Sequence, residues 1–150
     1  MSSCIFCDIA TGKAPASVVY RDDKCMAFMD IQPVTAGHLL VIPLAHAAGL
    51  ADLDAHLGGH IFQVAQRLAS GIRRSGLKAD GVNFLLADGE AAGQEVFHVH
   101  LHVFPRFGGD GFGHRFGPEY GRPVARERLD QEAAAIAKAA GPVRTRTPTP

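Results

Sequence analysis

The chain has 150 residues, of which 47% are hydrophobic and 20% are charged. This length suits a single domain, and the apolar content is high enough for one buried core, which excludes disordered, collagen-like and coiled-coil chains. Fifteen Lys and Arg residues balance fifteen Asp and Glu residues. The chain therefore lacks the basic excess that proteins use to bind long nucleic acids. Eight histidines are the unusual feature that remains, because histidine decides the charge of such a chain near neutral pH.

Five β-prone runs, bounded by turn residues, predict the strands of the domain. In chain order they are Ser17–Tyr20, Cys25–Phe28, His38–Ile42, Val82–Leu86 and Glu95–Phe104. The polar residues 21–24 suit a hairpin turn between the first two runs. The third run is almost wholly aliphatic, as in a strand that is buried on both faces.

Two helices are expected, one central and one near the C-terminus. Asp52 can cap the central helix, whose apolar residues recur at helical spacing as far as Arg73 and Arg74. A glycine-rich irregular segment at 108–122 precedes an alanine-rich helix at about 125–140. Strands joined by short turns, together with these helices, indicate an α+β fold on a mostly antiparallel sheet.

The domain is expected to span residues 1–140, followed by a flexible tail at 141–150. Residues 31–51 carry no formal charge, but prolines and glycines interrupt them, so a membrane span is not expected. The N-terminus lacks the basic and apolar regions of an export signal. We therefore expect a cytoplasmic protein with no membrane partner.

His98, His100 and His102 alternate strictly with aliphatic residues. This pattern is typical of a strand with one face in a core and the other facing a site, so all three imidazoles are expected on one face. Successive imidazoles would lie about 6.6 Å apart along the backbone, so that neighbours could converge on one metal ion or one phosphate. A half-exposed strand whose polar residues happen to be histidine is the alternative, although any other polar residue would serve there.

A nucleophilic histidine is one chemical interpretation of this row, and a metal site is the other. Neutral imidazole attacks phosphorus, and histidine is among the side chains that form covalent intermediates. A nucleophile in the middle of the row would have a neighbour on each side to hold phosphate oxygens. Its rear nitrogen must be fixed by an acceptor, for which a backbone carbonyl on the adjoining strand is a candidate.

The segment His98–Phe104 resembles the His-φ-His-φ-His-φ-φ signature of the histidine triad (HIT) family. Residues 28–43 resemble the second block of the family, and residues 92–96 resemble its lead-in to the triad. The resemblance covers about residues 4–107. It implies a HIT-like α+β fold that usually forms a homodimer. It also implies hydrolysis of phosphoramidates or phosphoanhydrides of a small, adenine-like nucleotide through a nucleotidyl-histidine intermediate.

The resemblance further implies the roles of individual residues. His100 would be the nucleophile, His102 would face the leaving group and phosphate, and His38 would be the fourth active-site histidine beside His98. The nucleotide-binding residues that it implies are Phe28, Asp30, Ile31, Gly93, Gln94 and Glu95. Asp30 would accept hydrogen bonds from the ribose hydroxyls, which suits a carboxylate.

Gly93 permits the loop before the triad to present backbone N–H groups close to a phosphate, and Gln94 adds an amide donor. Two positions depart from the family pattern. Ala87 stands where relatives carry a phosphate-contacting Asn or Gln, so Asp88 or another group would have to supply that contact. Glu95 replaces a smaller hydroxyl residue of some branches, and an acid there favours a basic leaving group unless it points away.

Cys4 and Cys7 have the spacing of half a tetrahedral zinc site, with packed thiols or a redox pair as alternatives. In zinc-bearing members of the superfamily the remaining ligands correspond to His46 and His98. Four protein ligands would close the coordination shell, so such a zinc would be structural, and the chemistry would require no cofactor. Two further histidines, His56 and His60, share a helix face but lack the glutamate of a zinc protease motif, so solvated or partly packed side chains are expected there.

The leading hypothesis is a nucleoside 5′-phosphoramidate hydrolase, because Asp30 and the cysteine pair favour that branch of the family. A dinucleoside polyphosphate hydrolase is the alternative within the family. Two other classes remain. One is a zinc-dependent hydrolase in which triad imidazoles hold a catalytic metal, and the other is a nucleotide-binding protein with little catalysis, for which Ala87 argues.

Overall fold

The structure, a computed structural model, describes residues 4–142. The chain divides into two units, one that ends at Phe112 and one that begins at Gly113. The boundary between the two units therefore falls inside the domain that was expected to span residues 1–140. Most of the expected tail, residues 143–150, lies outside the described part of the chain.

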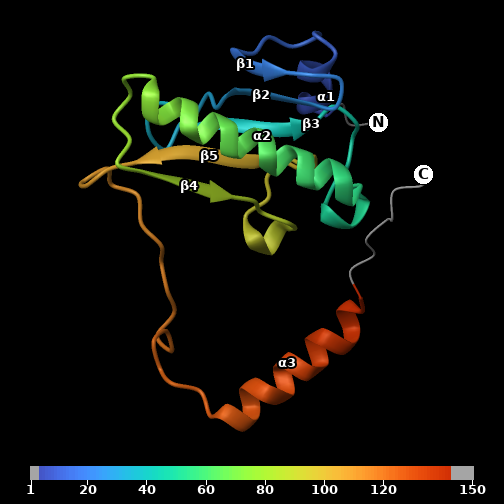
Figure 1. The fold of residues 1–150 in the computed structure, drawn as a ribbon, viewed down its shortest axis with the longest axis vertical. Coiled ribbons are helices and arrows are strands. Elements are labelled where there is room, and N and C mark those ends of the chain that lie inside the picture. The colour runs from blue at the N-terminus through green and yellow to red at the C-terminus, as the bar shows by residue number, and fades with distance from the viewer. Residues whose placement is uncertain (1–3, 143–150) are drawn as a thin grey trace, which may run out of the picture. The chain divides into compact units, whose positions relative to one another are not determined.

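One five-stranded antiparallel sheet forms the centre of the first unit (Figure 1). Its strands are β1 (Val18–Arg21), β2 (Cys25–Met29), β3 (Leu39–Pro43), β4 (Gly81–Leu85) and β5 (Leu101–Arg106). They lie in the order β1-β2-β3-β5-β4, and every neighbouring pair is antiparallel. The predicted α+β class, the hairpin turn between β1 and β2 and the buried third strand are confirmed.

Three α-helices accompany the sheet or follow it. They are α1 (Ile5–Ala10), α2 (Ala55–Arg74) and α3 (Arg126–Ala140), and short 3-10 turns lie at Leu50–Asp52 and Glu90–Ala92. The prediction that Asp52 caps the central helix is wrong, because Asp52 lies in the first 3-10 turn. Asp54 is the cap, and its Oδ1 accepts the N–H groups of His56 (3.0 Å) and Leu57 (3.1 Å).

The two faces of the sheet bury separate apolar cores. On one face, α2 packs on alternate strand residues, and the core residues are Cys25, Ala27, Leu39, Val41, Ile61, Val64, Ala65, Ile72, Leu101 and Val103. On the other face α1 covers a smaller core of Phe6, Ala10, Met26, Phe28, Leu40 and Ile42. Leu40 is paired with His102 across β3 and β5, so the face that carries α1 also carries the histidines.

The strand predicted over 95–104 is wrong at both ends, since β5 begins at Leu101 and continues through Pro105 to Arg106. Residues 95–100 leave the sheet, and the N–H of Val99 donates to the carbonyl of Ala47 (2.7 Å). The imidazole of His98 is thereby free to turn toward the cysteines. Helix α1 was not predicted, because six residues are too few for a clear helical period.

The described residues contain no helix that is long and apolar enough to cross a membrane. Strand β4 pairs only with β5 within the described sheet. Phe62 of α2 is exposed and packs against Phe84 of β4, so an apolar group lies beside this strand edge. The homodimer and the cytoplasmic location stay predictions.

Asp22 fastens the β1–β2 hairpin to α2. Its carboxylate accepts the N–H groups of Lys24 and Cys25 and the hydroxyl of Tyr20, and it lies 2.7 Å from Nε2 of His60. Burial would raise the pKa of Asp22, but these hydrogen bonds outweigh burial and hold the pKa well below its usual range. His60 is thus partly packed, as expected.

We expect Asp22→Asn to lower the free energy of unfolding at pH 7 by about 2 kcal/mol, because an amide accepts these bonds less strongly than a carboxylate. A carboxyl group whose pKa is lowered in the folded state stabilises the fold at pH values above its unfolded pKa of about 3.9. This stabilisation is lost as the pH falls below that value. Urea melts should therefore show a gap between variant and wild type that narrows below about pH 5. Asp23→Asn, at an exposed neighbouring carboxylate, should stay within about 0.5 kcal/mol of wild type. A gap that is constant with pH would contradict the assignment.

Candidate active site

A single cavity of about 740 Å³ brings most of the predicted site residues together. Its lining includes Phe28, Asp30, Ile31, His38, Gly93, Glu95, His100 and His102. The volume lies within the range of small-molecule sites. Helix α1 forms one wall through Ile5, Phe6 and Ile9, a contribution that the sequence analysis missed. The i, i+1, i+4 apolar spacing of those residues was the available signal.

The ring of His100 is fixed in one tautomer. Its Nδ1 lies 2.7 Å from the carbonyl oxygen of His98, and because a carbonyl only accepts, Nδ1 carries the proton. Nε2 of the neutral ring then has a free lone pair. The acceptor was expected on the adjoining strand, but it lies two residues back along the same segment. The edge-to-face contact with Phe6, with ring centroids 5.2 Å apart, packs the ring further.

A second chain of hydrogen bonds fixes His38 and His102. The backbone N–H of Val34 donates to Nδ1 of His38 (3.0 Å), so the proton of neutral His38 is on Nε2. This Nε2 lies 2.9 Å from Nδ1 of His102 and donates to it. The remaining nitrogen of His102, Nε2, is therefore an N–H donor. His102 and His100 are in ring contact, with centroids 4.9 Å apart, so a donor lies beside the ring of His100.

Asp30 lies beside this histidine pair. Its Oδ2 is 3.5 Å from Nε2 of His38 and 3.8 Å from Nδ1 of His102, and its Oδ1 accepts the N–H of Gln32 (2.8 Å). Ile31 follows with 94% of its surface exposed, although it also lines the cavity. A carboxylate and an apolar side chain thus lie next to each other in the cavity lining.

The loop before the triad is held by Gln94, which is buried. Its Oε1 accepts the N–H of Gly89 (2.8 Å), and its Nε2 donates to the carbonyls of Ala48 (2.7 Å) and Val96 (3.1 Å). The predicted role of Gln94 as an amide donor to phosphate is therefore wrong in this geometry, because both ends of the amide are used. Gly93, with φ +89°, makes the turn that this arrangement requires.

Neither Ala87 nor Asp88 lines the cavity. Oδ1 of Asp88 accepts the N–H of Leu50 (2.8 Å), so Asp88 does not supply the contact that Ala87 lacks. The backbone N–H groups of Glu95 and Val96 have no acceptor among the described residues. Both residues line the cavity, so these N–H groups are candidate donors to a ligand.

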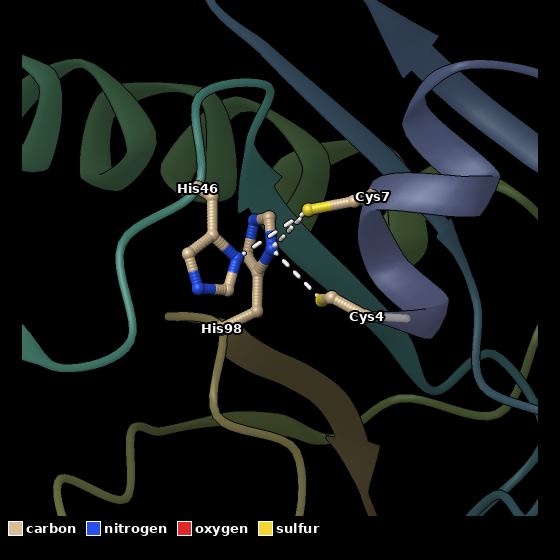
Figure 2. A group of neighbouring side chains, drawn as sticks. All are labelled: Cys4, Cys7, His46 and His98. Atoms are coloured by element: carbon tan, nitrogen blue, oxygen red, sulfur yellow. Dashed lines mark hydrogen bonds between the residues drawn. The ribbon is translucent and has the colours of Figure 1, made fainter. Parts of the chain in front are cut away.

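Cys4, Cys7, His46 and His98 form a cluster beside the cavity (Figure 2). The thiols, carried at the start of α1, point toward the two imidazoles. Sγ of Cys4 lies 3.4 Å from Nδ1 of His98, and Sγ of Cys7 lies 3.4 Å from Nδ1 of His46.

The tautomer of His98 suits a metal ion in this cluster. Its Nε2 lies 2.9 Å from the carbonyl of Pro43 and donates to it, which leaves the lone pair of Nδ1 facing the thiols. Burial and the neighbouring Cys4 raise the pKa of Cys7, so a cation is needed to hold the sulfur of Cys7 as a thiolate. The four ligand atoms lie within 4.8 Å of one another, and the set fits a tetrahedral metal ion.

Residues 11–109 match the model of the HIT domain. The chain belongs to the HIT family. Protein hit of Bacillus subtilis is 44% identical over 112 residues, which cover 74% of this chain and 77% of that protein. The resemblance expected from the triad and the upstream block is thereby confirmed.

Solved HIT structures share the fold. A HIT family member from Bacillus subtilis has a TM-score of 0.85 at 37% identity and covers 95% of this chain and 100% of its own. A Zn-bound histidine triad family protein from Mycobacterium smegmatis has a TM-score of 0.72 at 43% identity, with coverages of 93% and 98%. A histidine triad nucleotide-binding protein from Candida albicans has a TM-score of 0.81 at 27% identity, with coverages of 92% and 97%.

Two histidines of this HIT site are neutral at pH 7. Burial, and then the neighbouring rings of His100 and His38, lower the pKa of His102 to about 4. Burial likewise lowers the pKa of His38, against the opposing effect of Asp30. The hydrogen-bond chain described above requires this neutral state, because Nδ1 of each ring accepts a hydrogen bond and so carries no proton.

A histidine whose pKa is lowered in the folded state gives its full contribution to stability at pH values above its unfolded pKa of about 6.5. This contribution is lost as the pH falls toward the folded pKa. We expect His102 to account for about 2 kcal/mol of the stability lost between pH 7 and pH 5. Urea melts across this range should show a shallower decline for His102→Gln than for wild type. His56→Gln, at an exposed helix position, should keep the wild-type slope. If His102→Gln keeps it too, the ring is not held neutral.

Proposed function

We propose that this HIT protein hydrolyses the P–N bond of nucleoside 5′-phosphoramidates through a nucleotidyl-His100 intermediate. The observation that carries the proposal is the 2.7 Å hydrogen bond from Nδ1 of His100 to the carbonyl of His98. It leaves the Nε2 lone pair available inside a cavity of nucleotide size.

The cavity offers a partner to each part of such a substrate. Phe28, at the cavity wall, and Ile31 provide apolar surface for a base, and Asp30 can accept hydrogen bonds from ribose hydroxyls. The free N–H groups of Glu95 and Val96 can donate to the α-phosphate. Nε2–H of His102 lies beside His100 and can donate to a phosphate oxygen or to the leaving nitrogen.

The reaction has two displacements at phosphorus. In the first, the Nε2 lone pair of His100 forms a bond to the α-phosphorus, the P–N bond of the substrate breaks, and the leaving amine takes up one proton from solvent. In the second, water forms a P–O bond, the bond from phosphorus to Nε2 breaks, and one proton returns to solvent. The products are the amine and the nucleoside monophosphate, and His100 is regenerated.

The charges of the cavity favour this substrate over a dinucleoside polyphosphate. Its described lining contains the carboxylates Asp30 and Glu95 but no Lys or Arg. A chain of three or four phosphates would place several negative charges beside these carboxylates, with no cation to offset them. A phosphoramidate brings a single negative charge at the α-phosphate.

A metal-dependent hydrolase is the second candidate. Asp30, His38 and His102 place three ligand atoms within 4.8 Å of one another, which a catalytic metal ion could use. Against this, the hydrogen bond from Nε2–H of His38 already occupies Nδ1 of His102. The third candidate is a nucleotide-binding protein with little catalysis. Such a protein would bind AMP but would release no amine from a phosphoramidate.

His100→Ala should abolish both the covalent adduct and turnover. Intact-mass analysis of wild-type protein mixed with adenosine 5′-phosphoramidate should show one added AMP, because Nε2 of His100 has a free lone pair that can bond to phosphorus. Diadenosine tetraphosphate should give a much slower reaction. His56→Ala, at an exposed helix histidine, is the matched control and should retain turnover. Turnover by His100→Ala would rule out the nucleophile, and loss of activity with metal removal from an intact fold would favour the second candidate.

We also infer that zinc occupies the cluster of Cys4, Cys7, His46 and His98. Two thiols and two imidazoles are a common structural zinc set, and the Mycobacterium smegmatis relative is described as Zn-bound. A zinc ion with four protein ligands has no open position, so it would hold α1 against the triad segment and would not activate water.

Metal analysis should find about one zinc per chain in the wild type, and Cys7→Ser should lose most of it. Cys25→Ser is the control, because Cys25 is a buried thiol in another group with Asp22 and His60. Chelation should leave formation of the His100 adduct intact wherever circular dichroism shows an intact fold. If the Cys7→Ser variant keeps its zinc and the Cys25→Ser variant loses it, the ion is bound by the group of Asp22, Cys25 and His60, and the inference is wrong.

A further inference from the structure

Glu95 is the one cavity carboxylate with no described partner. Its side chain is exposed and lines the same cavity as His100 and His102, and no hydrogen bond or ion pair to it is found among the described residues. Asp30, by contrast, accepts the N–H of Gln32 and lies beside the histidine pair. The charge of Glu95 is therefore available to whatever enters the cavity.

The backbone of Glu95 is held in place even though its side chain is free. Gln94 ties the loop to Gly89, Ala48 and Val96, as described above. The N–H of Gln94 also donates to the carbonyl of Gly89 (3.2 Å). A carboxylate on a fixed backbone stays near one part of the ligand, which is the condition for it to discriminate between ligands.

Glu95 lines the same cavity as His100 and His102. In the proposed mode of binding its N–H donates at the phosphate end, next to the leaving group, whereas Asp30 and Ile31 lie at the nucleoside end. The neutral rings of His38 and His102 add no positive charge there at pH 7. A group that extends beyond the phosphate therefore meets a net negative environment from the described residues.

Resting on the proposed function, we propose that Glu95 selects phosphoramidates whose leaving amine carries a second, cationic group. The amine released from such a substrate is a diamine or a basic amino acid side chain. The carboxylate attracts the distal ammonium group and repels a carboxylate or phosphate at the same place. The bonds that form and break at phosphorus are those given above, and Glu95 takes no part in them.

The test uses three adenosine 5′-phosphoramidates that differ only in the amine: putrescine (distal ammonium), butylamine (neutral) and γ-aminobutyrate (distal carboxylate). Wild-type kcat/KM should be about two- to fivefold higher for the putrescine conjugate than for the butylamine conjugate, the size expected of an exposed charge pair. The γ-aminobutyrate conjugate should be the poorest. The putrescine preference should shrink in high salt, because salt screens exposed charges.

Glu95→Gln should bring the putrescine-to-butylamine ratio close to unity, and Glu95→Lys should reverse the order in favour of γ-aminobutyrate. Glu90→Gln, in the same loop at an exposed position outside the cavity lining, should keep the wild-type ratio. A wild type without preference, or a Glu95→Gln variant with an unchanged ratio, overturns the proposal. Failure of the proposed function itself is distinct, because His100→Ala would then turn over the butylamine conjugate as wild type does.

Discussion

The two attachments of His98 are the constraint on which the site depends. Its buried side chain donates from Nε2 to Pro43 and faces the thiols with Nδ1, while its backbone carbonyl accepts from Nδ1 of His100. The side chain fixes where this stretch of chain lies, and the carbonyl then fixes the tautomer of His100. Both require residues 95–100 to leave the sheet, since a regular strand would send that carbonyl to a neighbouring strand.

Burial keeps His38 and His102 neutral, and hydrogen bonds decide which nitrogen of each ring is protonated. An exposed histidine would be partly charged near neutral pH and would sample both tautomers. In this pair, the N–H of Val34 sets the tautomer of His38, and His38 sets the tautomer of His102. The free donor of His102 and the free lone pair of His100 thus lie on adjacent rings, although the two are fixed by separate backbone groups.

The sequence predicted those parts that follow from periodicity and from short motifs. The aliphatic third strand, the hairpin before it and the alternation of Leu101 and Val103 with His102 all follow from side chains that alternate between two faces. The parts that it missed depend on tertiary contacts. Gln94 looks like a phosphate donor until the carbonyls of Ala48 and Val96 occupy its amide. Likewise Asp52 has the side chain of a helix cap, but it lies in the 3-10 turn Leu50–Asp52, and Asp54 caps α2 instead.

The described lining of the cavity contains no Lys or Arg, and the proposed covalent mechanism gives this a physical rationale. In that mechanism the two cavity carboxylates, Asp30 and Glu95, repel the phosphate monoanion before attack. Once the P–Nε2 bond forms, Nδ1 keeps its proton and the ring becomes cationic. Asp30 and Glu95, which line the same cavity as His100, then stabilise this positive charge in the proposed intermediate. Interactions that are stronger after attack than before it favour the chemical step. The same carboxylates that disfavour a polyphosphate chain therefore favour the intermediate.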